Sequence, residues 1–318
     1  CPIGVIGVIF EARPDALVQI STLCIKSGNC CLLKGGSETA HTNAKLFEII
    51  LTAAMEAGLP EGSLGLLQSR QDVRDMLGLN GYIDLIIPRG SNAFVQYIMN
   101  NTSIPVLGHA DGICHVYVDK DADIAEAVRI VTDSKAQYVS VCNAAETLLV
   151  HRDIAAEALP QIAKSLNDAG VTIVGCRETC GIIAVQPASE KDWKTEYLDY
   201  KISVKIVGSA REAVEHINRY GSGHTDAIVT KNAQTAEYFM DAVDSANVYW
   251  NCSTRFADGY RYGFGAEVGI STNKIHARGP VGLDGLMIYK YKLYGSGQTA
   301  GEYADGKKHF KHIQLPCK

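Results

Sequence analysis

Short apolar runs alternate with amphipathic segments along the first third of the chain. Compact runs rich in β-branched and other apolar residues occupy positions 5–10, 30–34, 64–68 and 84–87. Between these runs, apolar side chains return at every third or fourth position, as they do on a helix that lies against a sheet. Strands that alternate with helices in this way predict an α/β fold with a parallel sheet.

The segment after Ser37 has the clearest helical pattern. Its apolar positions recur at steps of three and four residues, at Ala40, Ala44, Phe47, Leu51 and Ala54. Gly58 and Pro60 are typical residues for ending such a helix. A further helix is expected after residues 121–123, where two aspartates offer an N-cap.

A second series of alternating elements follows from about residue 136. Strands are predicted near residues 148–150, 171–174, 182–185, 204–207, 228–230 and 247–251, with helices such as 210–219 between them. We place the domain boundary near residue 135, which gives domains 1–135 and 136–286. The Gly-rich, polar stretch 251–285 is typical of a loop that lines a site, and equally of a plain connecting loop.

The final part of the chain, residues 287–318, has a different pattern. Residues 287–294 alternate between apolar and polar positions, which predicts an edge strand that pairs with another subunit. Residues 295–318 are expected to form a tail.

Composition and charge narrow the expected partners. The 318 residues are 47% hydrophobic, enough to fill two cores, and they carry a net charge of −5 without a basic stripe. We therefore expect a small-molecule substrate, no nucleic acid and no membrane. Ten cysteines without disulfide or redox spacing favour a soluble protein of the cytoplasm. Because the chain opens at Cys1 directly in a strand-like run, we expect an upstream segment to be missing.

Two turns have the composition of phosphate-binding turns. No GxGxxG follows the first strand and no GxxxxGK[ST] occurs, so a nucleotide needs another mode of binding. The turns Lys34-Gly35-Gly36-Ser37-Glu38 and Pro88-Arg89-Gly90-Ser91-Asn92 each follow a predicted strand. The first also stands at the start of a predicted helix. Backbone amides at such a point suit a phosphate, although a strand-to-helix turn also needs glycine for its own geometry.

Cys142 is the candidate nucleophile. It lies in Ser140-Val141-Cys142-Asn143-Ala144, between small and polar residues and just ahead of an apolar strand. A thiol is intrinsically nucleophilic toward acyl carbon, whereas unpaired cysteines more often act as small buried hydrophobes.

No metal site is expected from the spacing of the ligand-type residues. His109, His115, His216, His224 and Cys252 form no pair at helical or hairpin ligand spacing. His309 and His312 lie near Cys317 in the terminal tail, and we expect no metal there either.

Three blocks of sequence carry a resemblance to a known family. They are residues 213–228 with Tyr220-Gly221-Ser222-Gly223-His224-Thr225-Asp226, residues 142–147, and residues 255–280. Together with residues 2–15 they resemble the gamma-glutamyl phosphate reductase family, within the aldehyde dehydrogenase superfamily. The resemblance covers nearly the whole chain.

The resemblance implies a fold, a reaction and roles for particular residues. It implies a Rossmann-like NADP-binding domain that lacks GxGxxG, an α/β catalytic domain, and a small oligomerisation element, after an N-terminal segment that is absent here. The implied reaction is the reduction of L-glutamyl 5-phosphate by NADPH to L-glutamate 5-semialdehyde with release of phosphate, the second step of proline biosynthesis. Cys142 is then the nucleophile that forms a thioester, and Asn143 belongs to the oxyanion-binding neighbourhood.

The same resemblance assigns the binding residues. Cofactor-binding residues are expected at Lys34, Gly35, Gly36, Ser37, Arg89, Gly90, Ser91 and Glu196, and a small residue at Ser37 favours NADP over NAD. Substrate-binding residues are expected at His224, Thr225, Arg255 and Glu267. His109 stands where other aldehyde dehydrogenases carry a water-activating glutamate, and it either leaves water unactivated or packs structurally.

Two other functions stay open at this point. The chain is a different acylating aldehyde dehydrogenase, or it is an inactive fragment. The expected partners are a second copy of the chain, as a dimer or tetramer, and glutamate 5-kinase as a functional partner.

Overall fold

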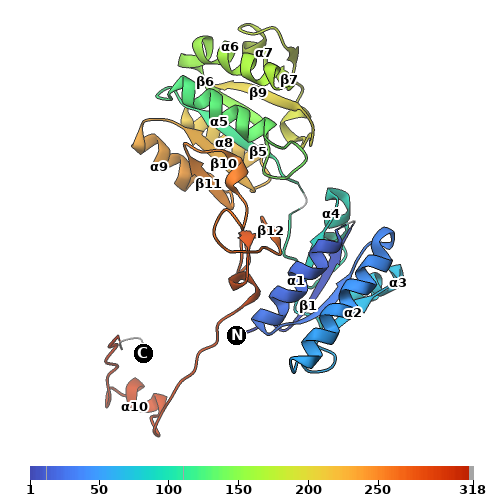
Figure 1. Cartoon of the computed structure of the whole chain (residues 1–318). Coiled ribbons are helices and arrows are strands. Elements are labelled where there is room, and N and C mark those ends of the chain that lie inside the picture. Colours follow the sequence, from blue (N-terminus) through green and yellow to red (C-terminus); the bar gives the residue numbers. More distant parts are fainter. Residues whose placement is uncertain (12, 110, 315–318) are drawn as a thin grey trace. The chain divides into compact units, whose positions relative to one another are not determined.

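The structure is a computed structural model that describes residues 1–11, 13–109 and 111–314. Cys317, considered above as a metal ligand, lies outside the described residues. The chain divides into two units, Cys1–Ile288 and Tyr289–Lys318. The first unit contains two parallel sheets and one antiparallel strand pair, and it is labelled by element in Figure 1.

The first sheet has four parallel strands in the order β3-β2-β1-β4. Its strands are β1 (Val5–Phe10), β2 (Cys30–Lys34), β3 (Leu64–Leu67) and β4 (Leu85–Arg89). Its helices are α1 (Pro14–Ser27), α2 (Ala40–Glu56), α3 (Arg70–Leu77) and α4 (Asn92–Asn100), with a 3₁₀ turn η1 (Ser37–Thr39) before α2. Because the chain runs outward from β1 to β3 and then returns to β4, the order of the strands reverses between β1 and β4.

Local sequence explains how α1 begins and ends. Pro14 stands at its first position, where the missing N–H costs nothing, and Asp15 lies in the positive first turn. Gly28 ends the helix in the left-handed conformation with φ 77°, and its amide donates to the last-turn carbonyls. These signals fix where β2 begins, two residues later.

The second sheet has seven strands in the order β11-β10-β5-β6-β9-β7-β8, all paired in parallel. The strands are β5 (Cys114–Val118), β6 (Ala145–His151), β7 (Thr172–Gly175), β8 (Gln186–Pro187), β9 (Lys201–Val207), β10 (Thr225–Val229) and β11 (Asn247–Trp250). The helices are α5 (Ile124–Ala136), α6 (Arg152–Asp168), α7 (Arg177–Cys180), α8 (Ala210–Tyr220) and α9 (Ala233–Ala242), with a 3₁₀ turn η2 (Asp192–Lys194).

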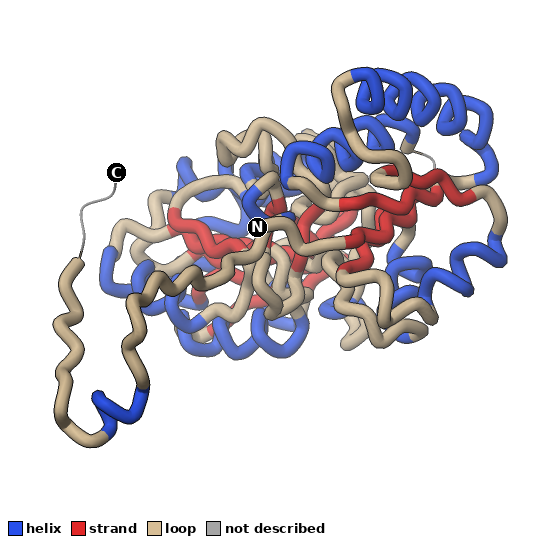
Figure 2. The backbone as a smooth tube through the Cα atoms, turned by 90° about the horizontal axis from the view of Figure 1, so that it is seen from below, coloured by secondary structure: helices blue, strands red, loops and turns tan. Residues whose placement is uncertain are grey.

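Each sheet has an apolar core on both faces. In the first sheet, α1 and α2 pack on one face and α3 and α4 on the other. In the second sheet, α5 and α6 cover one face while α8 and α9 cover the other. Figure 2 shows the helices on both sides of the strands. The continuous apolar runs of β1 and β5 follow from this burial on two faces.

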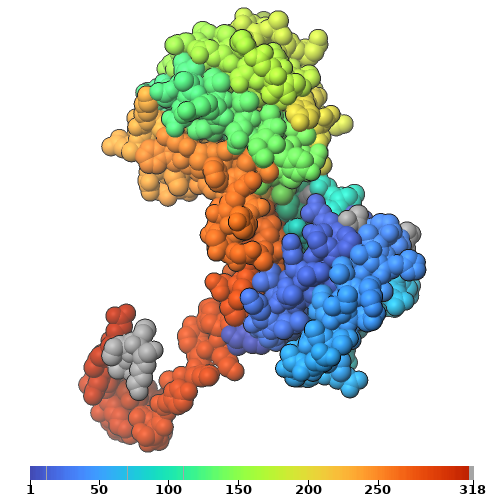
Figure 3. All heavy atoms as spheres, viewed as in Figure 1, coloured from blue at the N-terminus to red at the C-terminus, as the bar shows by residue number. Residues whose placement is uncertain are grey.

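The Gly-rich stretch after β11 connects the two sheets. It contains η3 (Thr254–Phe256), the antiparallel pair β12 (Gly269–Ser271) and β13 (Gly279–Val281), and η4 (Asp284–Leu286). Its apolar residues Val268, Val281 and Leu286 are part of the core of the first sheet. Figure 3 shows this stretch in orange, between the two sheet regions.

Two expectations about elements need correction. The change from one sheet to the other comes ahead of residue 135, because β5 and α5 belong to the second sheet. Residues 182–185 form a turn and irregular backbone, and the strand β8 is only the two residues that follow. Within the chain, residues 287–294 make an isolated bridge between Met287 and Pro2, and the pairing of this segment with another subunit stays a prediction.

In the described part of the second unit, residues 289–314 contain one short helix, α10 (Ala300–Ala304), in otherwise irregular backbone. A capping box between Thr299 and Glu302 begins this helix. Tyr303 stacks on Phe310 with ring centroids 4.5 Å apart. Within the described residues, no helix of either unit combines the length and apolarity that crossing a membrane requires.

Candidate active site

A cavity of about 660 Å³ lies between the carboxyl edge of the first sheet and the amino edge of the second. Arg13 and residues 89–91 follow the strands β1 and β4, whereas residues 141–143 precede β6. The reversal of strand order between β1 and β4 is the point where open α/β sheets bind ligands. The sequence-predicted residues that line this cavity are Arg89, Gly90, Ser91, Cys142, Asn143, Glu196, Arg255 and Glu267.

A four-residue turn presents Cys142 to the cavity. The Ala144 amide donates to the Val141 carbonyl at 3.1 Å, which places Cys142 and Asn143 at the corner of the turn. Cys142 is partly exposed, and Asn143 is buried with its Nδ2 donating to the Ala257 carbonyl at 2.9 Å. The expected nucleophile therefore has both access and a fixed backbone.

Gly112 lies directly against the turn. A Cβ atom added at this glycine would collide with the Cα and the carbonyl oxygen of Cys142. The close approach also places the Gly112 amide at the carboxylate of Glu196, to which it donates. Only glycine fits between the nucleophile and this carboxylate.

Glu196 is held on the opposite side of the turn. Asn92 donates to its Oε2, and burial raises the pKa of the Glu196 carboxyl while the hydrogen bonds from Asn92 and Gly112 oppose that rise. Asn92 also donates to Asp111 at 2.9 Å. The carboxylate is thus oriented by two donors from different segments.

Arg89 and Arg255, in addition to Arg13, bring positive charge to the cavity. Arg89, at the end of β4, is near Glu267, and burial lowers the pKa of its guanidinium. Arg255, in η3, is only 8% exposed, and its Nε donates to Gln137 at 2.9 Å. Burial also lowers the pKa of Arg255. Both guanidinium groups suit carboxylate and phosphate oxygens.

Glu267 and His109 complete the polar lining. Burial raises the pKa of Glu267, whose Oε2 accepts from the Gly259 amide at 2.7 Å. Burial lowers the pKa of His109, so this ring is neutral near pH 7. Its Nδ1 donates to the Ile270 carbonyl at 2.8 Å, which leaves Nε2 as an acceptor.

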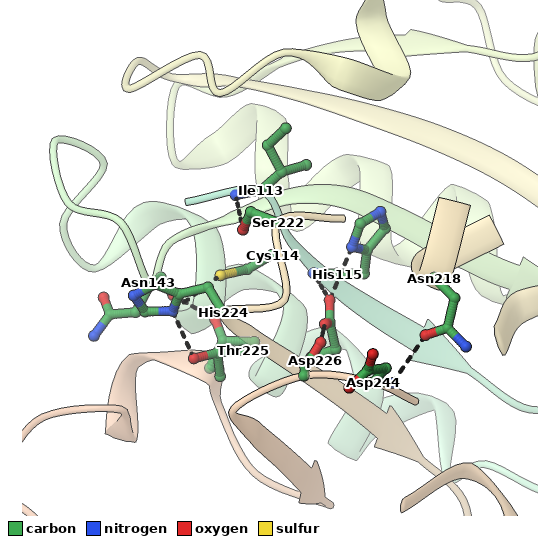
Figure 4. A network of polar contacts seen from close by, with 12 residues as sticks. Ile113, Cys114, His115, Asn143, Asn218, Ser222, His224, Thr225, Asp226 and Asp244 are labelled. Carbon is green, nitrogen blue, oxygen red and sulfur yellow. Dashed lines mark hydrogen bonds and ion pairs between the residues drawn. The ribbon is translucent and has the colours of Figure 1, made fainter. Parts of the chain in front are cut away.

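His224 and Thr225 lie behind the lining of the cavity. Both are fully buried, and Nδ1 of His224 pairs with Oγ1 of Thr225 at 2.8 Å. Figure 4 shows this bond and the neighbouring network, in which Asp226 accepts from the backbone amide and the ring of His115. His224 still reaches the site, because its ring is 4.8 Å from that of His109. Thr225 supports His224 from behind the cavity lining.

The turn at Lys34 lies on the same sheet edge but outside this cavity. Lys34 is buried and its Nζ donates to the Gly35 carbonyl at 2.5 Å, while Ser37 is exposed in η1. Gly35 is packed against Asn43 and Phe10, which leaves no room for a Cβ. Since β2 is the neighbour of β1, this turn extends the carboxyl edge of the sheet beyond the cavity.

Sequence reasoning missed two residues at the site. Arg13 lines the cavity, and Glu11 accepts from the Ser91 amide at 2.8 Å. Both follow the carboxyl end of β1. The general rule for open α/β sheets therefore contained the signal that identifies them.

Comparisons with known proteins agree with this architecture. The sequence model of the aldehyde dehydrogenase family matches residues 1–178. A gamma-glutamyl phosphate reductase of Acetivibrio thermocellus is 65% identical over 315 residues, which are 99% of this chain and 73% of the relative. The chain belongs to the gamma-glutamyl phosphate reductase family.

Other members of that family support the same placement. The gamma-glutamyl phosphate reductase 1 of Synechocystis is 57% identical over 316 residues, covering 99% of this chain and 73% of the relative. The crystal structure of the Thermotoga maritima gamma-glutamyl phosphate reductase has 44% identity and a TM-score of 0.91, with 94% of this chain and 73% of that chain covered. An acetylating aldehyde dehydrogenase of Geobacillus thermoglucosidasius, at 17% identity and a TM-score of 0.66, shares the fold alone.

Proposed function

We propose that this chain reduces L-glutamyl 5-phosphate to L-glutamate 5-semialdehyde with NADPH and releases inorganic phosphate, the second step of proline biosynthesis from glutamate. The observation that carries this proposal is the turn that presents Cys142 to a cavity at the strand-order reversal of the first sheet, in a chain of this family. A reductase with a covalent intermediate needs a nucleophile and a cofactor-binding sheet edge that face the same cavity.

The first step is acyl transfer to Cys142. The thiol loses its proton, and Sγ attacks the C5 carbonyl carbon of the acyl phosphate. The C5–O bond to the phosphoryl group then breaks, and inorganic phosphate leaves with that electron pair, so a thioester remains on Cys142. We assign the turn at Cys142 and the Asn143 side chain as the donors to the developing oxyanion, because both line the cavity.

The nicotinamide cofactor has a fitting place on the carboxyl edge of the first sheet. Arg13 and Arg89 supply positive charge for its phosphates, Glu196 is the carboxylate for the ribose of the nicotinamide half, and the Lys34–Ser37 turn is placed for the adenosine half. When bound, NADPH supplies the hydride that converts the thioester into a thiohemiacetal. Collapse of that adduct at Cys142 releases the aldehyde and restores the thiol.

Water must stay unreactive while the thioester exists. In this chain the residue beside the nucleophile is the neutral His109, whose Nδ1 is committed to the Ile270 carbonyl. A carboxylate at this point would activate water and hydrolyse the thioester, which would waste the activated substrate. We assign His109 to this protective role.

The substrate's charged groups have complementary side chains. Arg255 is assigned to the α-carboxylate or the phosphate, Glu267 to the α-ammonium, and His224 to the reacting end, where its Nε2 has no protein partner among the described residues. Thr225 acts indirectly by orienting His224.

The exposed Ser37 supports the choice of NADP. A small neutral side chain leaves room for the 2′-phosphate of NADP, whereas a carboxylate there would repel it. Nine free cysteines among the described residues fit a reducing compartment, and we assign the protein to the cytoplasm.

We also propose that the chain forms a homo-oligomer through residues 287–294. Tyr291 and Leu293 are 90% and 99% exposed, which is unusual for apolar side chains in a monomer. Glutamate 5-kinase is the functional partner, because an acyl phosphate is best passed directly to the enzyme that consumes it. Sedimentation of the purified chain, alone and mixed with the kinase, tests both statements.

The reaction is tested in the reverse direction with glutamate 5-semialdehyde and NADP. The account expects NADPH formation that requires inorganic phosphate and does not respond to coenzyme A. If coenzyme A replaces phosphate, and simple aldehydes are better substrates, the chain is instead a different acylating aldehyde dehydrogenase. No turnover with either acceptor would identify an inactive fragment.

A further inference from the structure

Three ligand-type side chains from separate segments converge on the candidate nucleophile. Cys142 comes from the turn before β6, His109 from the segment between α4 and β5, and His224 from the position just before β10. The thiol sulfur and one ring nitrogen of each histidine all lie within 4.8 Å of one another. Among the described residues, Cys142, His109 and His224 form the group of ligand-type side chains that lie close enough to share one ion.

In both rings the protein already engages Nδ1, as it does in many metal-ligating histidines. Nδ1 of His109 donates to the Ile270 carbonyl at 2.8 Å, and Nδ1 of His224 pairs with Thr225 Oγ1 at 2.8 Å. Such bonds at the second nitrogen are the usual support of a histidine ligand. Each ring is left with Nε2 for an ion, and in His224 that atom is buried without a protein partner.

We propose that Cys142, His109 and His224 bind a borderline-soft divalent ion of the Zn²⁺ class, with water as the fourth ligand, and that this ion reversibly blocks the nucleophile. The thiol proton is released as the S–Zn bond forms, and rebinding of the proton accompanies loss of the ion. The inhibition rests on the proposed function, because it assumes that Cys142 is the catalytic nucleophile. The binding of the ion does not depend on that function.

The ligand set selects this class of ion. One thiolate and two imidazoles suit Zn²⁺, whereas Mg²⁺ and Ca²⁺ prefer oxygen ligands. Tetrahedral bonds of about 2.3 Å to sulfur and about 2.0 Å to nitrogen place neighbouring ligand atoms roughly 3.3–3.6 Å apart. The observed separations of up to 4.8 Å therefore need to close by about 1 Å when the ion binds.

Charges around the group partly balance. Arg89 opposes a cation, whereas Glu196 and Glu267 favour one, and all three act on His109. Arg255 also opposes a cation, because it acts on Cys142 as Arg89 does. The two carboxylates therefore balance the two guanidinium groups.

The test is equilibrium dialysis of the full chain against Zn²⁺ alone, with Mg²⁺ as the comparison ion. We expect one Zn²⁺ per chain, no Mg²⁺, and about 100-fold weaker Zn²⁺ binding in both Cys142→Ser and His224→Asn, at the upper end of what loss of an orienting group costs. His41→Asn, an exposed histidine of α2, is the matched control and should bind as the wild type does.

Two outcomes overturn the proposal. Unchanged Zn²⁺ binding in Cys142→Ser, together with loss of binding when His309 and His312 are replaced, would place the ion in the second unit. Absence of stoichiometric Zn²⁺ binding in the wild type would contradict it directly. Thermal melting without metal verifies that each variant is folded. If His224→Asn does not fold, Cys142→Ser alone decides the result.

The dialysis experiment tests Zn²⁺ binding independently of the proposed catalytic reaction. Dialysis needs no turnover, so it remains informative if the proposed reaction is absent. If turnover is present, Zn²⁺ should inhibit it in the wild type, and a chelator should restore the full rate.

Discussion

At the scale of single residues, the site depends on how closely Gly112 approaches Cys142. We predict that Gly112→Ala lowers kcat by about 100-fold, because a displacement of about 1 Å at a reacting group has that effect. The added methyl would push on the backbone of the nucleophile. Steady-state kinetics measure the loss, and Gly81→Ala, where nothing lies within 4 Å, is the control. A normal kcat in Gly112→Ala would mean that the turn adapts freely.

The identity of residue 37 controls the choice of cofactor in this account. We predict that Ser37→Glu shifts the ratio of kcat/KM for NADP to that for NAD by at least about tenfold toward NAD, or about 1.4 kcal/mol. The new carboxylate would face the 2′-phosphate that only NADP carries. Thr42→Glu, exposed nearby on α2, is the control for a general charge effect. An equal shift in both variants would remove Ser37 from the cofactor site.

The sequence predicted the residues that line the cavity better than the residues that hold those side chains in place. Cys142, Glu196, Arg255 and Glu267 were expected from the resemblance, and all line one cavity. The contact of Asn92 with Glu196 was not expected, because it exists only where α4 meets the segment of Glu196. His109 and His224 lack ligand spacing along the chain because their proximity is created by the fold.

At the scale of elements, α8 brings a buried histidine against β9. His216 is 3% exposed, and Nζ of Lys205 donates to its Nδ1 at 3.2 Å. Burial first, and then the nearby charges of His115, Lys205 and Arg219, lower the pKa of His216 to about 2. The ring is therefore neutral in the folded chain throughout the range from neutral to mildly acidic pH.

This shift has a defined effect on stability. An unfolded histidine titrates near about pH 6.5, so below that value the unfolded chain binds a proton that the folded chain does not. Stability from this residue is present above about pH 6.5 and falls by up to about 1.4 kcal/mol per pH unit as the pH decreases toward the folded pKa.

Replacing the ring isolates the contribution of His216. We predict that His216→Gln loses less stability than the wild type between pH 7 and pH 5, measured as the free energy of unfolding in urea. Glutamine keeps an acceptor for Lys205 but does not titrate. His41→Asn should follow the wild-type curve, and a parallel curve for His216→Gln would show that His216 titrates normally.

The sequence predicted strands correctly where the apolar pattern and the length of the run both indicated a strand. Strands β1, β2, β6 and β9 were expected close to their observed positions, because each is a compact apolar run. Strand β5 was missed, although Cys114 to Val118 are all buried, because the polar His115 interrupts its apolar run. The boundary near residue 135 followed from that omission.

At the scale of the whole molecule, the two sheets meet edge to edge through one cavity. The first sheet contributes its carboxyl edge and the second its amino edge, and the stretch from 251 to 285 joins the two cores. The alternation of elements predicted the α/β fold. It did not predict which edges of the two sheets face each other, because no local sequence pattern indicates this.

The central claim is that Cys142 carries a glutamyl thioester. Mixing the chain with glutamate 5-semialdehyde and NADP in the absence of phosphate isolates this intermediate, because the aldehyde is oxidised to the thioester while NADP is reduced, and no acceptor then releases it. We predict a burst of one NADPH per active chain, an acyl group on Cys142 by mass spectrometry, and steady turnover once phosphate is added. The burst should be absent in Cys142→Ser, which should still bind NADPH normally. A burst that survives in Cys142→Ser, or an acyl group found on another cysteine, would contradict the account.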